Sequence, residues 1–377
     1  MKKVLLIPDS FKGTMSSAEI CTIMRQNVLQ YYPTAQVVEI PVADGGEGSV
    51  DAFLAAVGGK KISLVVKGPF MQDMDSFYAL LPDGTAVVEM AACAGLPLVG
   101  DTLTPDKTTT YGVGQLILHA VNQGCKKLVV ALGGSATNDL GAGAAAALGV
   151  RFINGAGQAF VPTGGTLAQI KQIDMSGLTP ALKNVDIVTM CDIDNPLYGE
   201  TGAAAIFGPQ KGASPAMVAL LDDGLRSAAD VIQQQLGCDI AHLPGAGAAG
   251  GMGGGMVAFL GSRLQMGIQT VLDTVGFDDL LQDADMIFTG EGKLDTQSLR
   301  GKVVVGVARR AKPKQVPVIA VVGDIGDGIE QVYQEGVSAV FSINRVAVDF
   351  AAAKLRSPKD LALTMDNLMR FCQTMGL

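Results

Sequence analysis

Strand-like and helix-like segments alternate at both ends of this 377-residue chain. Ser16 and Glu19 have the spacing of a capping box, which predicts a helix that begins there and runs to about residue 32. Expected strands lie at 3–8, 36–42, 286–289, 316–322 and 339–343, with further helices at 46–57, 303–310 and 328–335 and a last one from about 359. This alternation predicts a doubly wound parallel sheet built from both ends of the chain.

The middle of the chain has a different pattern. Runs at 62–66 and 85–90, punctuated by a Pro-Asp-Gly turn, are typical of antiparallel hairpins. Expected helices and strands then follow at 111–123, 127–132, 186–193 and 215–236. A chain of this length is too long for one ordinary core, so two domains are expected. We predict an α/β fold with one domain at 1–60 and 283–377 and a mixed-sheet α/β domain inserted at 61–282.

Composition excludes several classes of partner. The net charge of −8 argues against nucleic acid or an anionic membrane surface as the main partner. No apolar run approaches the ~18 residues of a membrane span, and the first one stops at Asp9, short of the ~7–15 residues of a signal-peptide core. Six scattered cysteines without a C-x-x-C pair fit buried thiols in a reducing compartment. We therefore expect a cytoplasmic protein.

Polar loops rich in glycine follow the expected strands. Glycine accounts for 48 of the 377 residues, and it lets backbone N–H groups approach a ligand closely. These loops lie at 9–14, 44–48, 133–139, 191–197, 207–213 and 289–302. Ligand sites of open α/β sheets lie at the carboxyl ends of strands. The loops thus predict a cleft between the two domains that binds ATP, Mg²⁺ and a small anionic acceptor.

The last of these loops brings both signs of charge together, as phosphoryl transfer requires. Glu291 and Asp295 can hold a hard cation or accept a proton, whereas Lys293, Arg300 and Lys302 can neutralise an anion. A solvated loop of mixed charge is the alternative interpretation.

Two earlier loops suit a metal ion and phosphate. Asp44 and Glu47 flank a Gly-Gly turn, and Mg²⁺ prefers few carboxylates with water and substrate oxygens; Asp44 as a helix cap is the alternative. Ser135, Thr137 and Asn138 precede a helix whose exposed N–H groups would attract phosphate.

A G-x-G-x-x-G pattern at 245–250 gives a weak signal for a dinucleotide site. The segment before it is short, and the next acid lies in a helical pattern, so close packing of glycines is the alternative explanation. An NAD-dependent oxidoreductase and a nucleotide-binding protein without turnover therefore remain competing functions.

Taken together, seven motifs resemble the bacterial glycerate kinase type-1 family. They lie at 9–12, 42–48, 133–139, 195–197, 207–213, 244–253 and 289–292. The resemblance implies ATP-dependent phosphorylation of D-glycerate, usually at the 2-hydroxyl, and two dissimilar α/β domains of which the outer one is flavodoxin-like. Formation of 3-phosphoglycerate, action on a related hydroxy acid, and a monomer or a homodimer all stay open. At one position, Leu140, the family usually has glycine, and this difference can alter the shape of the turn.

The mechanism that we expect is in-line transfer of the γ-phosphoryl group of ATP to a glycerate hydroxyl. The predicted catalytic residues are Asp192, as the base, with Lys293 and Asp295. Asp44 and Glu47 are the predicted Mg²⁺ ligands. The residues predicted to bind substrate or phosphate are Asp9, Ser10, Lys12, Ser135, Thr137, Asn138, Asn195, Lys211 and Arg300. The acids could exchange roles without changing this argument.

Overall fold

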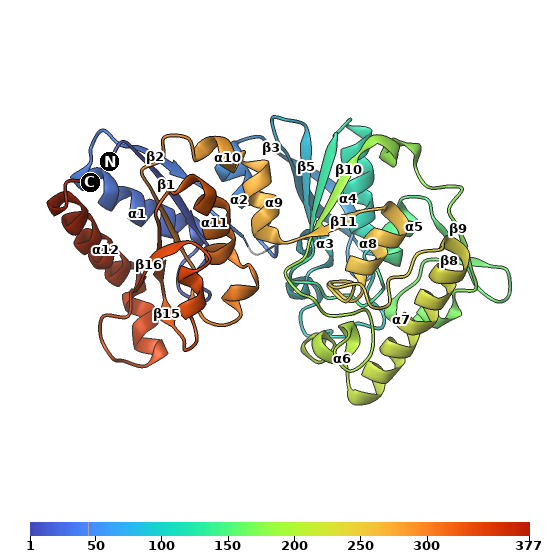
Figure 1. Ribbon diagram of the computed structural model, residues 1–377. Helices are drawn as coiled ribbons and strands as arrows, with labels where there is room; N and C mark the ends of the chain where they lie inside the picture. Colours follow the sequence, from blue (N-terminus) through green and yellow to red (C-terminus); the bar gives the residue numbers. More distant parts are fainter. Residues whose placement is uncertain (44) are drawn as a thin grey trace. The chain divides into compact units, whose positions relative to one another are not determined.

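The computed structural model describes residues 1–43 and 45–377, which fall into two compact α/β units (Figure 1). Unit 1 comprises Met1–Asp44, Ala55–Val57 and Met266–Leu377, and unit 2 comprises Gly45–Leu54 and Gly58–Gln265. The domain boundaries near 60 and 283 stay predictions, and each unit is described by itself.

Unit 1 is built on a five-stranded parallel sheet in the order β16-β14-β12-β1-β2. Its strands are β1 (Lys3–Pro8), β2 (Gln36–Glu39), β12 (Met286–Gly290), β14 (Val318–Val322) and β16 (Val337–Ser342). Val4, Leu5, Leu6 and Ile7 are all fully buried. A continuous apolar run of this kind is expected of a strand that is covered on both faces.

Helices cover both faces of this sheet. Helices α1 (Ser17–Tyr31) and α12 (Phe350–Thr374) pack side by side, blue and dark red in Figure 1, against Leu6 and Phe288. Leu5 and Ile7 point to the opposite face because strand side chains alternate, and α11 (Val303–Ala311) contacts the same strands. Helices α9 (Gly267–Thr274) and α10 (Phe277–Leu280) complete the unit's α-helices among the described residues.

Unit 2 has a six-stranded mixed sheet in the order β11-β10-β6-β5-β4-β3. Its strands are β3 (Lys60–Lys67), β4 (Asp73–Leu80), β5 (Thr85–Glu89), β6 (Lys127–Ala131), β10 (Asp186–Met190) and β11 (Arg263–Gln265). The expected antiparallel pairing is confirmed for β3 with β4 and for β4 with β5, but β5 also pairs in parallel with β6. Helix α4 (Tyr111–Asn122) packs on these strands, and α7 (Pro215–Leu236) has the predicted bounds, with the side chain of Ser214 capping its start.

The remaining elements are short. They are α2 (Ser49–Val57), α3 (Ala91–Ala94), α5 (Ala142–Ala147), α6 (Ala203–Phe207), α8 (Met252–Leu260), β7 (Arg151–Ile153), β8 (Ala159–Phe160), β9 (Gln172–Asp174), β13 (Lys293–Leu294), β15 (Asp324–Ile325), and the 3-10 turns η1 (Leu96–Val99), η2 (Gly164–Gln169), η3 (Pro180–Asn184), η4 (Pro209–Lys211), η5 (Ser298–Arg300), η6 (Lys312–Lys314) and η7 (Glu330–Tyr333). Within the described ranges, no helix combines the length and the apolarity needed to cross a membrane.

Two sequence predictions near the C-terminus are wrong. The helix expected at 328–335 is only the 3-10 turn η7. The last helix, expected from about residue 359, begins at Phe350, where the side chain of Asp349 accepts a hydrogen bond from the backbone N–H of Ala352. Pro358 lies inside that helix, although proline usually marks a helix start or a break.

Glycine lets backbone segments of unit 2 approach each other closely. A Cβ atom placed on Gly255 in α8 would lie 1.9 Å from the carbonyl oxygen of Leu140. Helix α8 can therefore pack on the turn before α5 only if residue 255 has no side chain.

We predict that Gly255→Ala lowers the free energy of unfolding by about 1–3 kcal/mol or more, because the backbone around Leu140 must move. In an open helix the same change would raise stability by up to about 1 kcal/mol. Urea denaturation measures the difference. Gly155→Ala is the control, because the nearest atom to its added Cβ lies 3.9 Å away. Equal or higher stability of Gly255→Ala would contradict the packing.

Candidate functional site

The polar residues of unit 1 gather at the carboxyl ends of β1 and β12. These two strands pair in parallel, with Pro8 opposite Gly290, and the backbone N–H of Asp9 donates to the carbonyl of Gly290 at 2.8 Å. In chain order β12 is the third strand of the sheet, so the strand order changes direction between β1 and β12. Such a switch point is where open α/β sheets bind ligands.

Glu291 is the buried acid of this region. The residue comes directly after β12 and is 5% exposed, and its Oε1 atom has no hydrogen-bond partner in the described structure. Burial raises the pKa of its carboxyl group to about 7, and the nearby Asp9 and Asp295 raise the pKa further, against a hydrogen bond from Ser298 and the charge of Lys302. Glu291 was noted in the sequence but not placed among the predicted site residues, because burial cannot be seen in a loop sequence.

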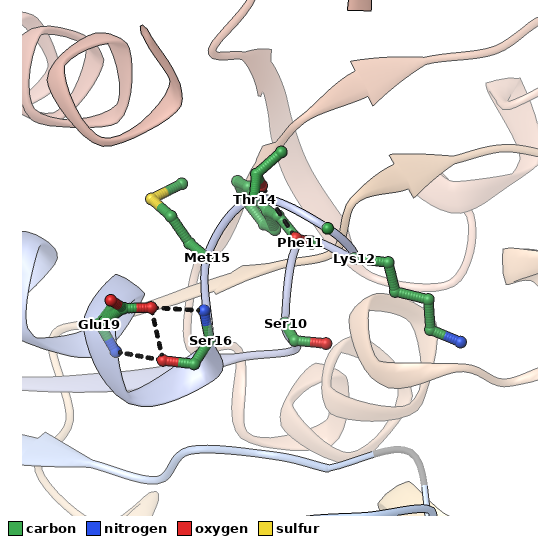
Figure 2. A pocket seen from close by; sticks show the side chains of 8 residues that line it. Ser10, Phe11, Lys12, Thr14, Met15, Ser16 and Glu19 are labelled. Carbon is green, nitrogen blue, oxygen red and sulfur yellow. Dashed lines mark hydrogen bonds between the residues drawn. The ribbon is translucent and has the colours of Figure 1, made fainter. Parts of the chain in front are cut away.

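The other predicted residues of unit 1 lie around these strand ends. Ser10 and Lys12 line a pocket that runs to Glu19, and the Lys12 side chain points away from the Ser16 and Glu19 hydrogen bonds (Figure 2). Asp9 accepts a hydrogen bond from the N–H of Ser10 at 2.6 Å. Among the loop residues after β12, Lys293 and Arg300 are exposed, and Asp295 is half-buried.

In unit 2, the loop between β6 and α5 surrounds a buried lysine. The Nζ atom of Lys211, in η4, donates to Ser135 Oγ and to the carbonyl of Thr137, each at 2.7 Å. Lys211 is only 2% exposed, and burial lowers the pKa of its ammonium group to about 7, while the charge of Asp139 acts in the opposite direction. We call Lys211, Ser135, Thr137 and Asn138 the Lys211 cluster.

Two members of the Lys211 cluster have polar atoms without partners. Thr137 Oγ1 and both amide atoms of Asn138, Oδ1 and Nδ2, are buried and make no hydrogen bond within the described structure. Both residues are fully buried. Buried polar atoms are almost always paired with protein or water, so three such atoms in adjacent residues require an explanation.

Asp139 holds the loop of this cluster in place. Its carboxylate accepts hydrogen bonds from the N–H and hydroxyl of Thr110 at 2.7 and 2.9 Å, and from the N–H groups of Gly141 and Gly143 at 3.1 and 3.2 Å. Burial raises the pKa of this carboxyl group, and the four hydrogen bonds oppose that effect. Asp139 was missing from the predicted site residues, although it closes the motif that contains three of them.

The conformation of the Lys211-cluster loop also depends on Leu140, in the turn after it, and on the glycines of the 245–250 segment, which pack against it. Leu140 has a φ of 60°, a left-handed conformation that glycine adopts most easily. The turn thus keeps a glycine-like shape despite the leucine. A Cβ atom on Gly250 would lie 2.1 Å from the carbonyl of Thr137, and one on Gly247 would lie 2.3 Å from that of Pro196. These contacts favour close packing as the reason for the G-x-G-x-x-G pattern.

The predicted base Asp192 and the predicted metal ligand Glu47 are less deeply buried than the Lys211 cluster. Asp192 is half-buried just after β10, and Asn195 Nδ2 donates to the carbonyl of Thr201 at 2.8 Å. Glu47 is exposed in the turn before α2, and Asp44 lies outside the described residues. Among the residues that are described, no group of three or more His, Cys, Asp or Glu side chains forms a metal site.

A buried acid that the sequence analysis missed positions this turn. Glu89, at the end of β5, is buried and accepts a hydrogen bond from the N–H of Val50 at 2.9 Å. Burial raises the pKa of its carboxyl group, and the N–H groups of Val50 and Gly48 lower it. Glu89 therefore fixes the start of α2 and the turn that carries Glu47.

Comparisons with known proteins agree with one another. The model of the glycerate kinase family matches residues 4–373. The glycerate kinase of Bacillus cereus (strain ATCC 10987 / NRS 248) is 44% identical over 368 residues, which cover 97% of each chain. The glycerate 2-kinase of Escherichia coli (strain K12) is 43% identical over 343 residues, 90% of each chain. A crystal structure described as a candidate glycerate kinase 2 from Salmonella typhimurium LT2 superposes with a TM-score of 0.88 at 38% identity, covering 100% of this chain and 99% of the other.

We predict that Glu291 makes the free energy of unfolding fall as the pH rises. Its pKa is about 7 in the folded protein, against 4.5 ordinarily, so the folded state binds the proton more tightly. The stability that the folded protein gains from this tighter proton binding is complete below about pH 4.5 and is lost as the pH rises through 7. Relative to Glu291→Gln, the wild-type free energy of unfolding should drop by up to about 3 kcal/mol across this window.

Urea denaturation of both proteins at intervals from pH 4.5 to 8 measures this difference. Glu330→Gln, at an exposed glutamate of unit 1, is the control and should follow the wild-type curve. Parallel curves for wild type and Glu291→Gln would show that Glu291 does not titrate in this range.

Proposed function

Since the chain belongs to the glycerate kinase family and is a kinase, we propose that it transfers the γ-phosphoryl group of ATP to the 2-hydroxyl of D-glycerate. The products are then 2-phosphoglycerate and ADP. The observation that carries this choice is the 43% identity to the E. coli glycerate 2-kinase over 90% of both chains. Phosphorylation at the 3-hydroxyl or of a related hydroxy acid is the alternative outcome.

We propose that the two compact units correspond to the two predicted domains, with the unit 2 domain inserted into the first. The strand order of unit 1 supports a flavodoxin-like class, because its five strands, numbered within the unit, lie in the order 2-1-3-4-5. The thiol groups, all free and five of them buried, fit a reducing cytoplasm as the site of the reaction.

In the proposed step, Asp192 accepts the proton of the 2-hydroxyl while that oxygen forms a bond to the γ-phosphorus. The bond between the γ-phosphorus and the β–γ bridging oxygen breaks, and ADP leaves. Lys12, Lys293 and Arg300 neutralise charge on the phosphates and the substrate carboxylate, and Arg300 can do so with a two-pronged fork. Asp9, Ser10, Asn195 and the Lys211 cluster contribute to substrate or phosphate binding, while Asp295 is a further catalytic residue beside Lys293.

The residues fit a Mg²⁺ ion that arrives on the nucleotide better than a resident metal ion. Mg²⁺ commonly binds one or two carboxylates together with water and substrate phosphates, and the exposed Glu47 with Asp44 could supply those carboxylates. The described residues hold no larger acidic or histidine cluster that could retain a metal ion alone. When bound, the ion would neutralise charge on the β- and γ-phosphates.

The product assay tests the proposed function directly. The protein is incubated with ATP, Mg²⁺ and D-glycerate, ADP release is followed, and phosphorus NMR identifies the ester. We expect 2-phosphoglycerate in amounts equal to ADP, and no ADP above background without D-glycerate or with excess EDTA. A 3-phosphoglycerate signal would overturn the choice of hydroxyl, and absence of any ester would overturn the kinase reaction on this acid.

The base is tested separately. Asp192→Asn should lower kcat by about 10²–10⁴-fold, the usual contribution of a general base, while thermal unfolding stays near that of wild type. Asp194→Asn is the matched control, an exposed acid two residues away, and should keep kcat within about threefold. A loss below tenfold in a folded Asp192→Asn protein would remove Asp192 from this role.

A further inference from the structure

We propose that the Lys211 cluster binds the carboxylate and a hydroxyl group of the hydroxy-acid substrate, rather than a phosphate of the nucleotide. This inference rests on the proposed function, and it goes further by giving one site the recognition of the acid. It replaces the phosphate-binding role that the sequence predicted for Ser135, Thr137 and Asn138, and it leaves Lys12, Lys293 and Arg300 to the phosphates instead of the substrate carboxylate.

The first argument is the type of the atoms without partners. Asn138 Oδ1 can only accept a hydrogen bond, Asn138 Nδ2 can only donate, and Thr137 Oγ1 can do both. A fully ionised phosphate group accepts hydrogen bonds but has no proton to donate, so it would leave Asn138 Oδ1 unpaired. D-glycerate offers carboxylate acceptors and, besides the 2-hydroxyl that Asp192 deprotonates, a 3-hydroxyl that can donate, and it can therefore satisfy all three atoms.

The second argument is charge. Lys211 is the cation of the cluster, and Asp139 lies close enough for its charge to affect the lysine. Lys211 uses two of its three N–H donors on Ser135 Oγ and the Thr137 carbonyl. One cation beside one buried carboxylate suits a ligand with a single negative charge. The phosphates of ATP carry several charges and would be repelled by Asp139.

The third argument is that the loop of the cluster and the loop that carries the proposed base are held by one glycine segment. The glycine segment 245–250 packs on the Thr137 carbonyl through Gly250, and the N–H of Gly247 donates to the carbonyl of Asn195 at 3.1 Å. The loop that carries Asp192 and the loop of the Lys211 cluster therefore pack on the same segment within unit 2. Gly134, the neighbour of Ser135 in the chain, is exposed, so the loop reaches the surface beside the buried cluster.

Thr137→Val provides the sharpest test, because Thr137 Oγ1 makes no hydrogen bond in the described structure. The variant has nearly the same shape and should be at least as stable as wild type, whereas its Kd for D-glycerate should rise about tenfold. Thr85→Val is the matched control, for which we expect the opposite result: a loss of stability without a change in substrate binding. It removes a buried hydroxyl that donates to Asp83 at 2.9 Å, so stability should fall while the Kd for D-glycerate stays unchanged.

Lys211→Met and Asn138→Ala complete the experiment. Calorimetric titration of the full chain with D-glycerate, with propionate as an acid that lacks hydroxyls, and with a non-hydrolysable ATP analogue plus Mg²⁺ gives three Kd values for each protein. We expect Lys211→Met to raise the Kd for D-glycerate at least thirtyfold and the Kd for the ATP analogue less than threefold. Asn138→Ala should raise the Kd for D-glycerate and leave the Kd for propionate nearly unchanged.

Each other outcome overturns the inference. Weaker binding of the ATP analogue with unchanged D-glycerate would assign the cluster to the nucleotide, through its phosphates or its ribose hydroxyls. Unchanged Kd values in Thr137→Val and Asn138→Ala would make the cluster a structural feature, as would the absence of D-glycerate binding to wild type. If Lys211→Met does not fold, Thr137→Val still decides.

The product assay separates this inference from the proposed function. If wild type binds D-glycerate through the cluster but forms no phosphate ester, the kinase proposal fails and the site stands. If wild type forms 2-phosphoglycerate and the cluster variants bind D-glycerate normally, the site fails and the kinase proposal stands.

Discussion

The buried carboxylate of Asp139 is the contact on which the geometry of unit 2 depends. It accepts hydrogen bonds from Thr110 at the start of α4 and from Gly141 and Gly143 at the start of α5. A buried acid that lost these donors would be strongly destabilising, so the two helix starts are held at fixed positions relative to each other. The loop before Asp139 is held with them, and this loop carries the unpaired atoms of Thr137 and Asn138. Their lack of partners is therefore a feature of a fixed loop.

Glu291 in unit 1 is a buried acid of a different kind. The Asp139 carboxylate accepts hydrogen bonds from backbone N–H groups and threonine hydroxyls on two helix starts, whereas Glu291 has a hydrogen bond from Ser298 and an oxygen with no partner. Both carboxyl groups have a raised pKa because they are buried. The difference in hydrogen bonding indicates that Asp139 organises the fold around it, while Glu291 keeps an oxygen available at the switch point of its sheet. An available buried carboxylate at such a position is a common property of ligand sites.

Local signals made part of the fold predictable from sequence. The capping box at Ser16 and the Ser214 cap with a following proline give α1 and α7 at their observed starts. The start of α12 was predicted about nine residues too late, because the helix begins at the Asp349 cap and continues through Pro358. For the candidate site, the sequence identified residue types after strands, and the structure places Lys211 against Ser135. The sequence alone could not identify Asp139 or Glu291 as site residues, because their importance comes from burial and from partners far away in the chain. The left-handed turn at Leu140 was likewise hidden, since leucine rarely adopts it.

The most direct test of this account is a crystal structure of the protein soaked with D-glycerate and a non-hydrolysable ATP analogue with Mg²⁺. The account predicts density for the acid with its carboxylate within hydrogen-bond distance of Lys211 Nζ and a hydroxyl next to the Asn138 amide. It also predicts that the loop held by Asp139 keeps its present conformation. Density for a nucleotide phosphate at Lys211, or for D-glycerate bound elsewhere with Thr137 and Asn138 unchanged, would contradict it.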